Sequence, residues 1–299
     1  MNLLTIPSKL RKNGMLGSAR KIYRMVTPYR SREMSKYLHQ FENAKGIEIG
    51  GPTHWAFGTK GLIPIYLIID NLDNVNPRSD NVYHNARAGR IYAGRTYRFD
   101  ERKSAGMQYA VEAADLSMIA SDTYDVLLSS HMIEHTSNPI RVLLEWTRIV
   151  RLGGFQLIIV PNKELTFDHY RTTTTLQHMI DDFEADRDEG DLTHLNESIE
   201  LNDYSMMSFD GETFKSRAVK NLETRCLHHH TFTLHSLRQL LEYMNLDIIE
   251  LVAEPAYHLI ALVRSSVDRT LPAEKGQLSV VLPTREVHLL DANAASLLD

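Results

Sequence analysis

The chain has 299 residues, of which 43% are hydrophobic, and this is enough to bury the core of one large domain with additions. Its formal net charge of -5 excludes a bulk attraction to nucleic acid or to a membrane surface. The single cysteine, Cys226, excludes an internal disulfide framework, and no apolar run reaches the roughly 18 residues of a membrane span or forms a signal-peptide core. We therefore expect a soluble cytoplasmic protein.

Residues 1–44 are rich in lysine and arginine, and apolar residues at roughly helical spacing, from Met15 to Val26, predict an amphipathic helix. The basic face has two interpretations: a solvated surface on a packing helix, or a surface for an anionic substrate or phospholipid.

The stretch 46–58, GIEIGGPTHWAFG, predicts a short buried strand followed by a turn. Glu48 lies inside the apolar run and requires a hydrogen-bond donor, because an unpaired buried carboxylate is costly. Gly50 and Gly51 allow a sharp turn and a close approach of the backbone to a ligand. A second apolar run, IYLII, predicts a strand that ends at Asp70, about 20 residues further on, where an acid can bind ribose hydroxyls. Together these features predict a nucleoside pocket.

A third strand is expected at Met107–Val111, followed by a loop that carries Glu112, Ala113 and Asp115. Such loops line the ligand crevice of an open parallel sheet, and a carboxylate there can accept a hydrogen bond from an adenine amino group. Asp115 can equally serve as a helix cap, because apolar residues at helical spacing follow it.

The segment YDVLLSS, residues 124–130, predicts a strand buried on both faces, and it leads into HMIEH. A helix is expected from Pro139, and the next strand, FQLIIVP, at residues 155–161. This order predicts a parallel right-handed crossover.

The segments GIEIGG, EAADLS, YDVLLSSHMIEH, NPIRVLLEWTRIVRLGG and FQLIIVPN together resemble a class I S-adenosylmethionine-dependent methyltransferase of the type 11 methyltransferase-domain group. The resemblance covers residues 46–162 and resumes at 232–264. It implies an α/β fold with a Rossmann-like, seven-stranded, mostly parallel sheet that closes with an antiparallel C-terminal hairpin.

The resemblance also implies which residues bind S-adenosylmethionine. They occupy the glycine turn, the ribose position, the adenine loop and the end of the fourth strand: Glu48, Gly50, Gly51, Asp70, Glu112, Ala113, Asp115 and Ser130. One departure is the run Thr53-His54-Trp55, which stands where the family's first motif has a further small residue.

A hydroxyl acceptor would require a general base, for which a histidine is suited. The candidates are His131 and His135, with Asp168 and His169 behind them; alternatively, the residues of HMIEH only tie a loop to its neighbours. HMIEH could also bind a metal, completed by the histidines of 228–230, although no metal belongs to the expected cofactors.

We expect five regions: a basic helical segment at 1–44, the cofactor-binding half of the core at 45–162, an inserted substrate cap at 163–230, the rest of the core at 231–264, and a tail at 265–299 in which QLSVVLP could add an edge strand. The expected function is methyl transfer to a small molecule or glycan precursor, with no nucleic acid and no integral membrane segment. The alternatives are a non-catalytic S-adenosylmethionine-binding module and an NAD-dependent oxidoreductase, although Thr-His-Trp spoils the fingerprint of the latter.

Overall fold

A computed structural model of the protein describes residues 30–77, 93–254 and 257–265. Their core is one eight-stranded sheet with the order β3-β4-β2-β1-β5-β6-β8-β7. The strands are β1 (Lys45–Ile49), β2 (Asn71–Asn76), β3 (Gly94–Tyr97), β4 (Gly106–Ala110), β5 (Tyr124–Ser130), β6 (Val150–Pro161), β7 (Asp247–Glu254) and β8 (His258–Arg264).

Five neighbouring strands, β4, β2, β1, β5 and β6, run parallel. At one side, β8 is antiparallel to both β6 and β7, which confirms the predicted C-terminal hairpin and the Rossmann-like α/β class. At the other side, β3 pairs antiparallel with β4 and adds an eighth strand to the seven that were expected.

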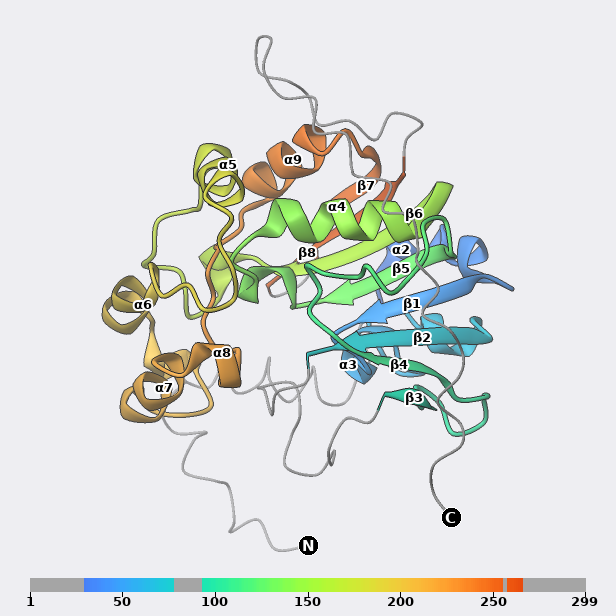
Figure 1. Cartoon of the computed structure of the whole chain (residues 1–299), viewed down its shortest axis with the longest axis horizontal. Helices are drawn as coiled ribbons and strands as arrows, with labels where there is room; N and C mark the ends of the chain where they lie inside the picture. Colours follow the sequence, from blue (N-terminus) through green and yellow to red (C-terminus); the bar gives the residue numbers. More distant parts are fainter. Residues whose placement is uncertain (1–29, 78–92, 255–256, 266–299) are drawn as a thin grey trace, which may run out of the picture.

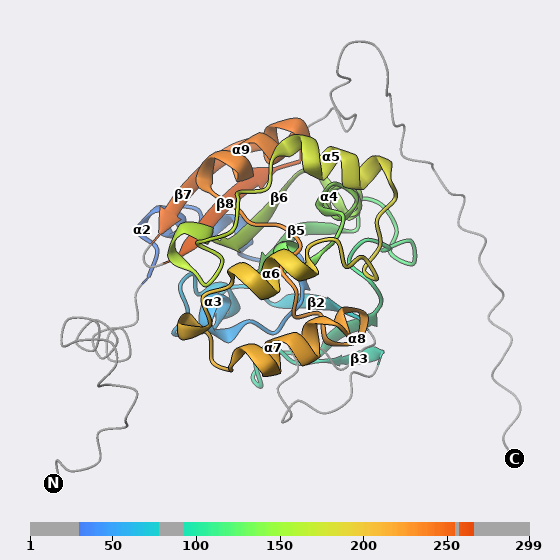
Figure 2. The ribbon, with the colours of Figure 1, turned by 90° about the vertical axis from the view of Figure 1, so that its left-hand side faces the viewer.

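Helices cover both faces of the sheet and gather at one of its ends. They are α2 (Arg32–Ser35), α3 (His54–Phe57), α4 (Pro139–Ile149), α5 (Leu176–Glu184), α6 (Leu195–Leu201), α7 (Gly211–Ala218), α8 (Asn221–Thr224) and α9 (Leu234–Tyr243). Figure 1 shows α4 and α9 across one face of the sheet. Figure 1 shows α6, α7 and α8 grouped together to the left of the sheet, and Figure 2, viewed from that side, shows them in front of it.

The local sequence explains the best-defined elements. The buried residues of β5 and β6 lie on both faces, as expected for central strands. Helix α4 begins where the Asn138 side chain accepts a hydrogen bond from the Arg141 amide, with Pro139 in the first turn. Its apolar side joins one hydrophobic core with α9, and a second core fills the opposite face of the sheet.

The prediction of a strand at IYLII is wrong. Residues Ile65–Leu67 form a 3-10 helix, and the buried Ile65, Tyr66 and Ile69 pack against a face of the sheet. The real strand, β2, is the polar sequence NLDNVN directly after it. An apolar run of this length does not by itself distinguish a strand from a turn that fills the core.

Two expectations lie outside the described residues: the amphipathic pattern from Met15 to Val26, and the edge strand QLSVVLP at 277–283. Where the chain is described from residue 30 onward, it contains the one-turn α2 and a 3-10 helix, Leu38–Phe41. No helix in the described part is both long and apolar enough to cross a membrane.

Candidate functional site

The turn after β1 is anchored to β2 by asparagine side chains. The Gly51 amide donates to Asn74 Oδ1 at 3.0 Å, and Asn76 Nδ2 donates to the Gly51 carbonyl at 2.8 Å. Gly50 has φ +85°, a conformation that L side chains rarely adopt, and a Cβ there would lie 3.2 Å from the Met132 side chain. The predicted glycine turn is therefore present, and the bonds that shape it come from β2.

Glu48 supports this turn from beneath. Its fully buried carboxylate accepts hydrogen bonds from the Tyr66 hydroxyl at 2.6 Å, from the Tyr97 hydroxyl, and from the Thr53 amide at 3.0 Å. Burial raises the pKa of Glu48, and these donors counteract that rise. The predicted hydrogen-bond donors to Glu48 are therefore present: they are the hydroxyls of Tyr66 and Tyr97 and the Thr53 amide of the turn.

A crevice opens at the carboxyl ends of β1, β2, β4 and β5, where the ligands of open parallel sheets bind. We call it the strand-end crevice. It is lined by Ile49, Gly50, Val75, Asn76, Pro77, Glu112, Ala113, Met132, His135, Thr136, Glu189 and Arg225. Three predicted cofactor residues, Gly50, Glu112 and Ala113, and one predicted catalytic residue, His135, meet there.

Two residues of the inserted segment cross the crevice. Arg225 Nη2 lies 2.7 Å from Glu112 Oε1, and its Nη1 lies 3.1 Å from Glu189 Oε2. Burial raises the pKa of Glu189 to about 7 and also raises that of Glu112, while the Arg225 guanidinium opposes both shifts. Sequence reasoning missed Arg225 and Glu189, because only the fold brings them to the strand ends.

The assignment of Asp70 to ribose binding needs correction. Asp70 immediately precedes β2, so it lies at the amino end of that strand, where it forms an ion pair with Lys103. Asn76 is the residue at the carboxyl end, inside the strand-end crevice. The error follows from the misassigned strand. Because β2 begins after Asp70 and not before it, the residue at the carboxyl end of the strand is Asn76 and not Asp70.

The remaining predicted cofactor residues do not line the crevice. Asp115 is exposed, and its carboxylate accepts a hydrogen bond from the Ser117 amide at 3.2 Å, as a turn residue does. Ser130 is buried at the end of β5, and its hydroxyl has no hydrogen-bond partner among the described residues. Gly51 and Glu48 shape the turn behind the crevice.

A buried group of histidines and carboxylates adjoins the crevice through His135. The His135 ring contacts that of His228 with centroids 4.5 Å apart, and its Nε2 lies 4.0 Å from a carboxylate oxygen of Glu134. His228 Nδ1 lies 2.6 Å from Asp168 Oδ2, and Arg171 Nη1 lies 2.9 Å from the other oxygen of that carboxylate. Of the predicted catalytic residues, the structure therefore brings His135 and Asp168 into one group.

Burial and neighbouring charges shift the pKa values of Asp168 and His228 in opposite directions. Burial would raise the pKa of Asp168, but the charges of His228 and Arg171 outweigh it and hold the pKa below its usual range. Burial would lower the pKa of His228, and Asp168 raises it instead. Burial lowers the pKa of His135 well below its usual value and raises that of Glu134 to about 7.

The other two predicted catalytic residues lie apart. His131 has φ +50° and its Nε2 lies 3.0 Å from His258 Nδ1, with the exposed Trp55 ring packed 5.0 Å from its own. His169 Nδ1 lies 2.9 Å from the Thr166 carbonyl, and neither residue lines the strand-end crevice.

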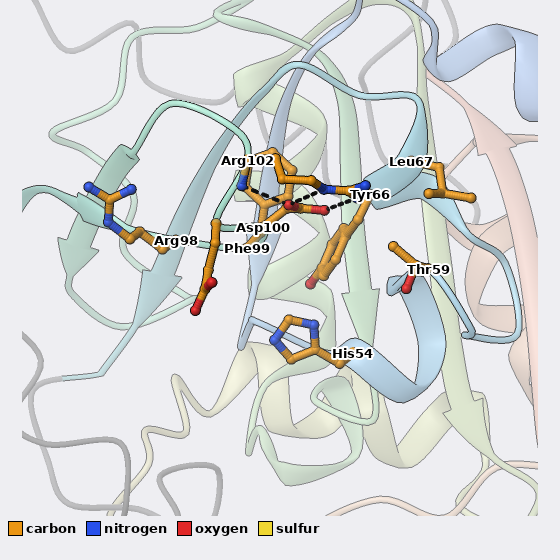
Figure 3. Close-up of a pocket in the computed structure, with 9 residues that line it drawn as sticks. His54, Thr59, Tyr66, Leu67, Arg98, Phe99, Asp100 and Arg102 are labelled. Carbon is orange, nitrogen blue, oxygen red and sulfur yellow. Dashed lines mark hydrogen bonds and ion pairs between the residues drawn. The ribbon is translucent and has the colours of Figure 1, made fainter.

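A second, larger hollow of about 700 Å³ lies between α3 and the loop that follows β3. Figure 3 shows His54, Thr59 and Tyr66 on one side of it and Arg98 and Phe99 on the other. It is not at the carboxyl ends of the parallel strands, so its size does not make it the cofactor site.

Two groups of side chains in the described ranges could hold a metal ion. One is Glu134, His135 and His228, which combines HMIEH with the 228–230 triplet. The other combines three residues from earlier in the inserted segment with one histidine of that triplet: His178, Asp182, His194 and His230.

The chain is similar to known methyltransferases in part of its sequence and in its fold. Residues 92–158 match a family model described as a methyltransferase domain, while no curated protein matches the chain. Among solved structures, the chain is similar to a putative methyltransferase from Bacillus halodurans with 11% identity and a TM-score of 0.42, over 79% of this chain and 100% of that one. It is also similar to an S-adenosylmethionine-dependent methyltransferase from Aquifex aeolicus with 11% identity and a TM-score of 0.44, over 87% and 98%.

The family match covers β3, β4, β5 and α4 and ends within β6. The mostly parallel sheet and the antiparallel hairpin are those that the sequence resemblance implies. The chain therefore carries a match to a methyltransferase domain, on the fold that was expected for a class I S-adenosylmethionine-dependent methyltransferase.

Proposed function

We propose that S-adenosylmethionine binds in the strand-end crevice with its ribose at Asn76. Asn76 is 2% exposed, and its Nδ2 is occupied by the Gly51 carbonyl. Its Oδ1 is buried without a hydrogen-bond partner among the described residues, although buried acceptors are almost always satisfied. A ribose hydroxyl would supply the missing donor, so the amide takes the place of the expected acid.

Glu112 and Ala113 would face the adenine, at the end of β4. In the structure the Glu112 carboxylate is engaged by Arg225, so an adenine amino group would share or replace that guanidinium. Gly50 would let the methionine part approach the backbone, since no side chain projects from it. The cofactor supplies an activated methyl group on its sulfonium.

We propose a hydroxyl group of a small molecule or glycan precursor as the acceptor. The observation that carries this proposal is the His135 ring, which lines the crevice and is backed by a buried histidine–carboxylate pair. His135 Nδ1 donates to the Leu227 carbonyl at 3.1 Å, which puts the basic lone pair of the ring on Nε2, and burial keeps the ring neutral by lowering its pKa. Asp168 orients His228, which packs against His135 and fixes its ring.

Calorimetry with S-adenosylmethionine and with NAD tests the cofactor site. We expect S-adenosylmethionine to bind, Asn76→Ala to weaken it about 5- to 20-fold through the lost ribose hydrogen bond, and Asp70→Asn to leave it unchanged. Tighter binding of NAD, or an effect of Asp70→Asn equal to that of Asn76→Ala, would contradict the site.

Methyl transfer to a panel of sugars, nucleotide sugars and phenols tests the acceptor. His135→Ala should lower kcat about 100-fold or more on a hydroxyl acceptor while S-adenosylmethionine still binds, because general bases contribute on this scale. His235→Ala, on the exposed side of α9, is the control. A wild-type protein that binds the cofactor yet methylates nothing in the panel would favour the non-catalytic binding module.

A further inference from the structure

Four potential ligand side chains of the inserted segment converge close to where the chain leads into α9. Each offers one nitrogen or oxygen atom, and these atoms lie within 4.8 Å of one another. We call them the cap histidine cluster: His178, Asp182, His194 and His230. We propose that this cluster is a zinc site that ties α5 and the start of α6 to the end of the inserted segment, where the His230 amide donates to the Glu134 carbonyl of the core.

The spacing of the ligand atoms fits a tetrahedral ion. His178 Nε2 lies 3.0 Å from His194 Nε2 and 3.3 Å from Asp182 Oδ2, and that oxygen lies 3.7 Å from His230 Nε2. Bonds of about 2.0–2.1 Å to zinc separate neighbouring ligands in a tetrahedron by roughly 3.3 Å. The cluster is therefore close to the required size without a large movement of the backbone.

The hydrogen-bonding capacity of the cluster also points to a cation. His194 Nδ1 lies 3.4 Å from Glu197 Oε2, so its hydrogen belongs on that side and its Nε2 presents a lone pair. Both this lone pair and Asp182 Oδ2 then face the single hydrogen on His178 Nε2. With the His178 proton on Nδ1 instead of Nε2, a metal ion could bind His178 Nε2, His194 Nε2 and Asp182 Oδ2 together, and Glu197 would act as the carboxylate that orients a ligating histidine.

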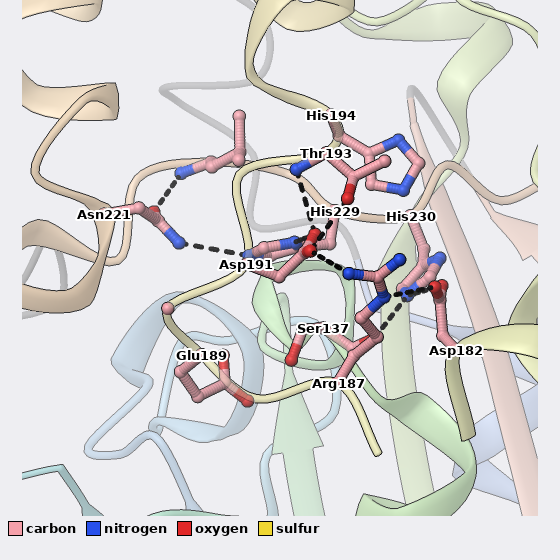
Figure 4. Close-up of polar contacts among 12 residues, drawn as sticks. Ser137, Asp182, Arg187, Glu189, Asp191, Thr193, His194, Asn221, His229 and His230 are labelled. Atoms are coloured by element: carbon pink, nitrogen blue, oxygen red, sulfur yellow. Dashed lines mark hydrogen bonds and ion pairs between the residues drawn. The ribbon is translucent and has the colours of Figure 1, made fainter. Parts of the chain in front are cut away.

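The local surroundings allow the ion to enter and be retained. The His178 side chain is 37% exposed and the His230 side chain is fully buried, so the cluster extends from the surface into the core. Arg187 Nε lies 3.8 Å from Asp182 Oδ1, which leaves Oδ2 to the histidines. Figure 4 shows Asp182 and His230 facing each other below His194. His230 Nε2 also lies 3.2 Å from the Ser137 carbonyl, a contact that it would exchange for the metal.

Three histidines and one carboxylate suit zinc better than magnesium or calcium, which prefer oxygen ligands. The ligands come from α5, from the residue that begins α6, and from the segment before α9. Between Asp182 and His194 the chain carries Glu189, which lines the strand-end crevice. The ion would thus fix the loop that holds one wall of the crevice.

The test uses the full chain, stripped with a chelator and titrated with Zn²⁺, with metal content measured by plasma mass spectrometry after desalting. We expect one equivalent, a visible absorption band typical of tetrahedral coordination with Co²⁺, and a rise in Tm of about 5–10 °C at saturating metal. His178→Ala and His194→Ala should weaken binding about 100-fold or more, and Glu197→Gln about 10-fold. His235→Ala should bind like the wild type.

The other candidate group supplies the decisive comparison. If His228→Ala removes the ion while His178→Ala retains it, the ion belongs to the group of Glu134 and His135, and the proposal is overturned. Retention of no metal by the wild type, or unchanged binding in both His178→Ala and His194→Ala, overturns it equally. Because His178 is partly exposed, its replacement is expected to leave the fold intact, which circular dichroism can verify.

Discussion

Replacing Gly51 with alanine tests whether Glu48 holds the turn after β1. A Cβ on Gly51 would lie 2.5 and 2.7 Å from the two carboxylate oxygens of Glu48, closer than real Cβ atoms approach. The carboxylate cannot move away freely, because Tyr66, Tyr97 and Thr53 hold it in the core. Either the turn or the carboxylate must therefore shift.

The expected loss of stability follows from the two ways in which the Gly51→Ala variant can relieve this contact. Overpacking a buried site costs about 1–3 kcal/mol, and each hydrogen bond to the charged carboxylate that is lost adds about 1.5–3 kcal/mol. We expect Gly51→Ala to lower the free energy of unfolding by about 3–5 kcal/mol. At about 2–4 °C per kcal/mol for a domain of this size, Tm should fall by roughly 6–20 °C.

Urea denaturation followed by circular dichroism measures the loss, and Gly153→Ala provides the matched control. Gly153 also has no side chain, but its φ is +71° and a Cβ there meets nothing within 4 Å, so its replacement costs only the conformational strain of about 1–2 kcal/mol. In the double variant Glu48→Ala/Gly51→Ala, the combined loss should be smaller than the sum of the single losses. A Gly51→Ala variant as stable as Gly153→Ala would refute the role of Glu48.

Three further changes act on buried charges. Burial raises the pKa of Glu189 to about 7, so the native state binds more protons than the unfolded state between about pH 4.5 and 7. The free energy of unfolding should therefore fall as pH rises through this window. Glu189→Gln should flatten that pH dependence in urea titrations. Arg225→Met removes the cation that pairs with Glu189 and with the partly exposed Glu112, and it should destabilise the protein by about 1–3 kcal/mol in the same assay at pH 8. Asp168→Asn removes the buried one of the two carboxylates that pair with Arg171 and should cost about 3 kcal/mol, measured at pH 7; a loss below about 1 kcal/mol would contradict the ion pair's importance.

The parts of the fold that the sequence predicts correctly are those with an unambiguous local pattern. The continuous apolar runs of β5 and β6 identify central strands, and Pro139 after Asn138 marks the start of α4. The β2 strand has no such pattern, because NLDNVN carries buried asparagines. Asn74 is tolerated there since its amide donates to Gln108 and to the Gly51 carbonyl, contacts that exist only after the strands pair.

The same distinction applies to the residues of the candidate site: those that follow recognisable strands could be predicted, and those on the insertion could not. Gly50, Glu112 and Ala113 follow strands that the sequence places correctly, and all three line the crevice. Arg225 and Glu189 lie on a long insertion whose path over the sheet has no local signature. The triplet at 228–230 was connected with HMIEH as a possible metal site, and this did not identify Arg225 or Glu189.

The two sides of the crevice therefore depend on different parts of the chain. The side where we propose that the cofactor binds is built by β1, β2 and β4, and Glu48 and Asn76 fix the glycine turn there through bonds within the core. The opposite wall comes from the inserted segment, which reaches the core through the ion pair of Arg225 with Glu112 and through the His230 amide on the Glu134 carbonyl. Substitutions in the inserted segment can thus reshape the wall that would meet the acceptor while β1 and β2 keep the turn in place. A change of acceptor specificity would accordingly require changes within residues 163–230 and leave the asparagines of β2 as they are.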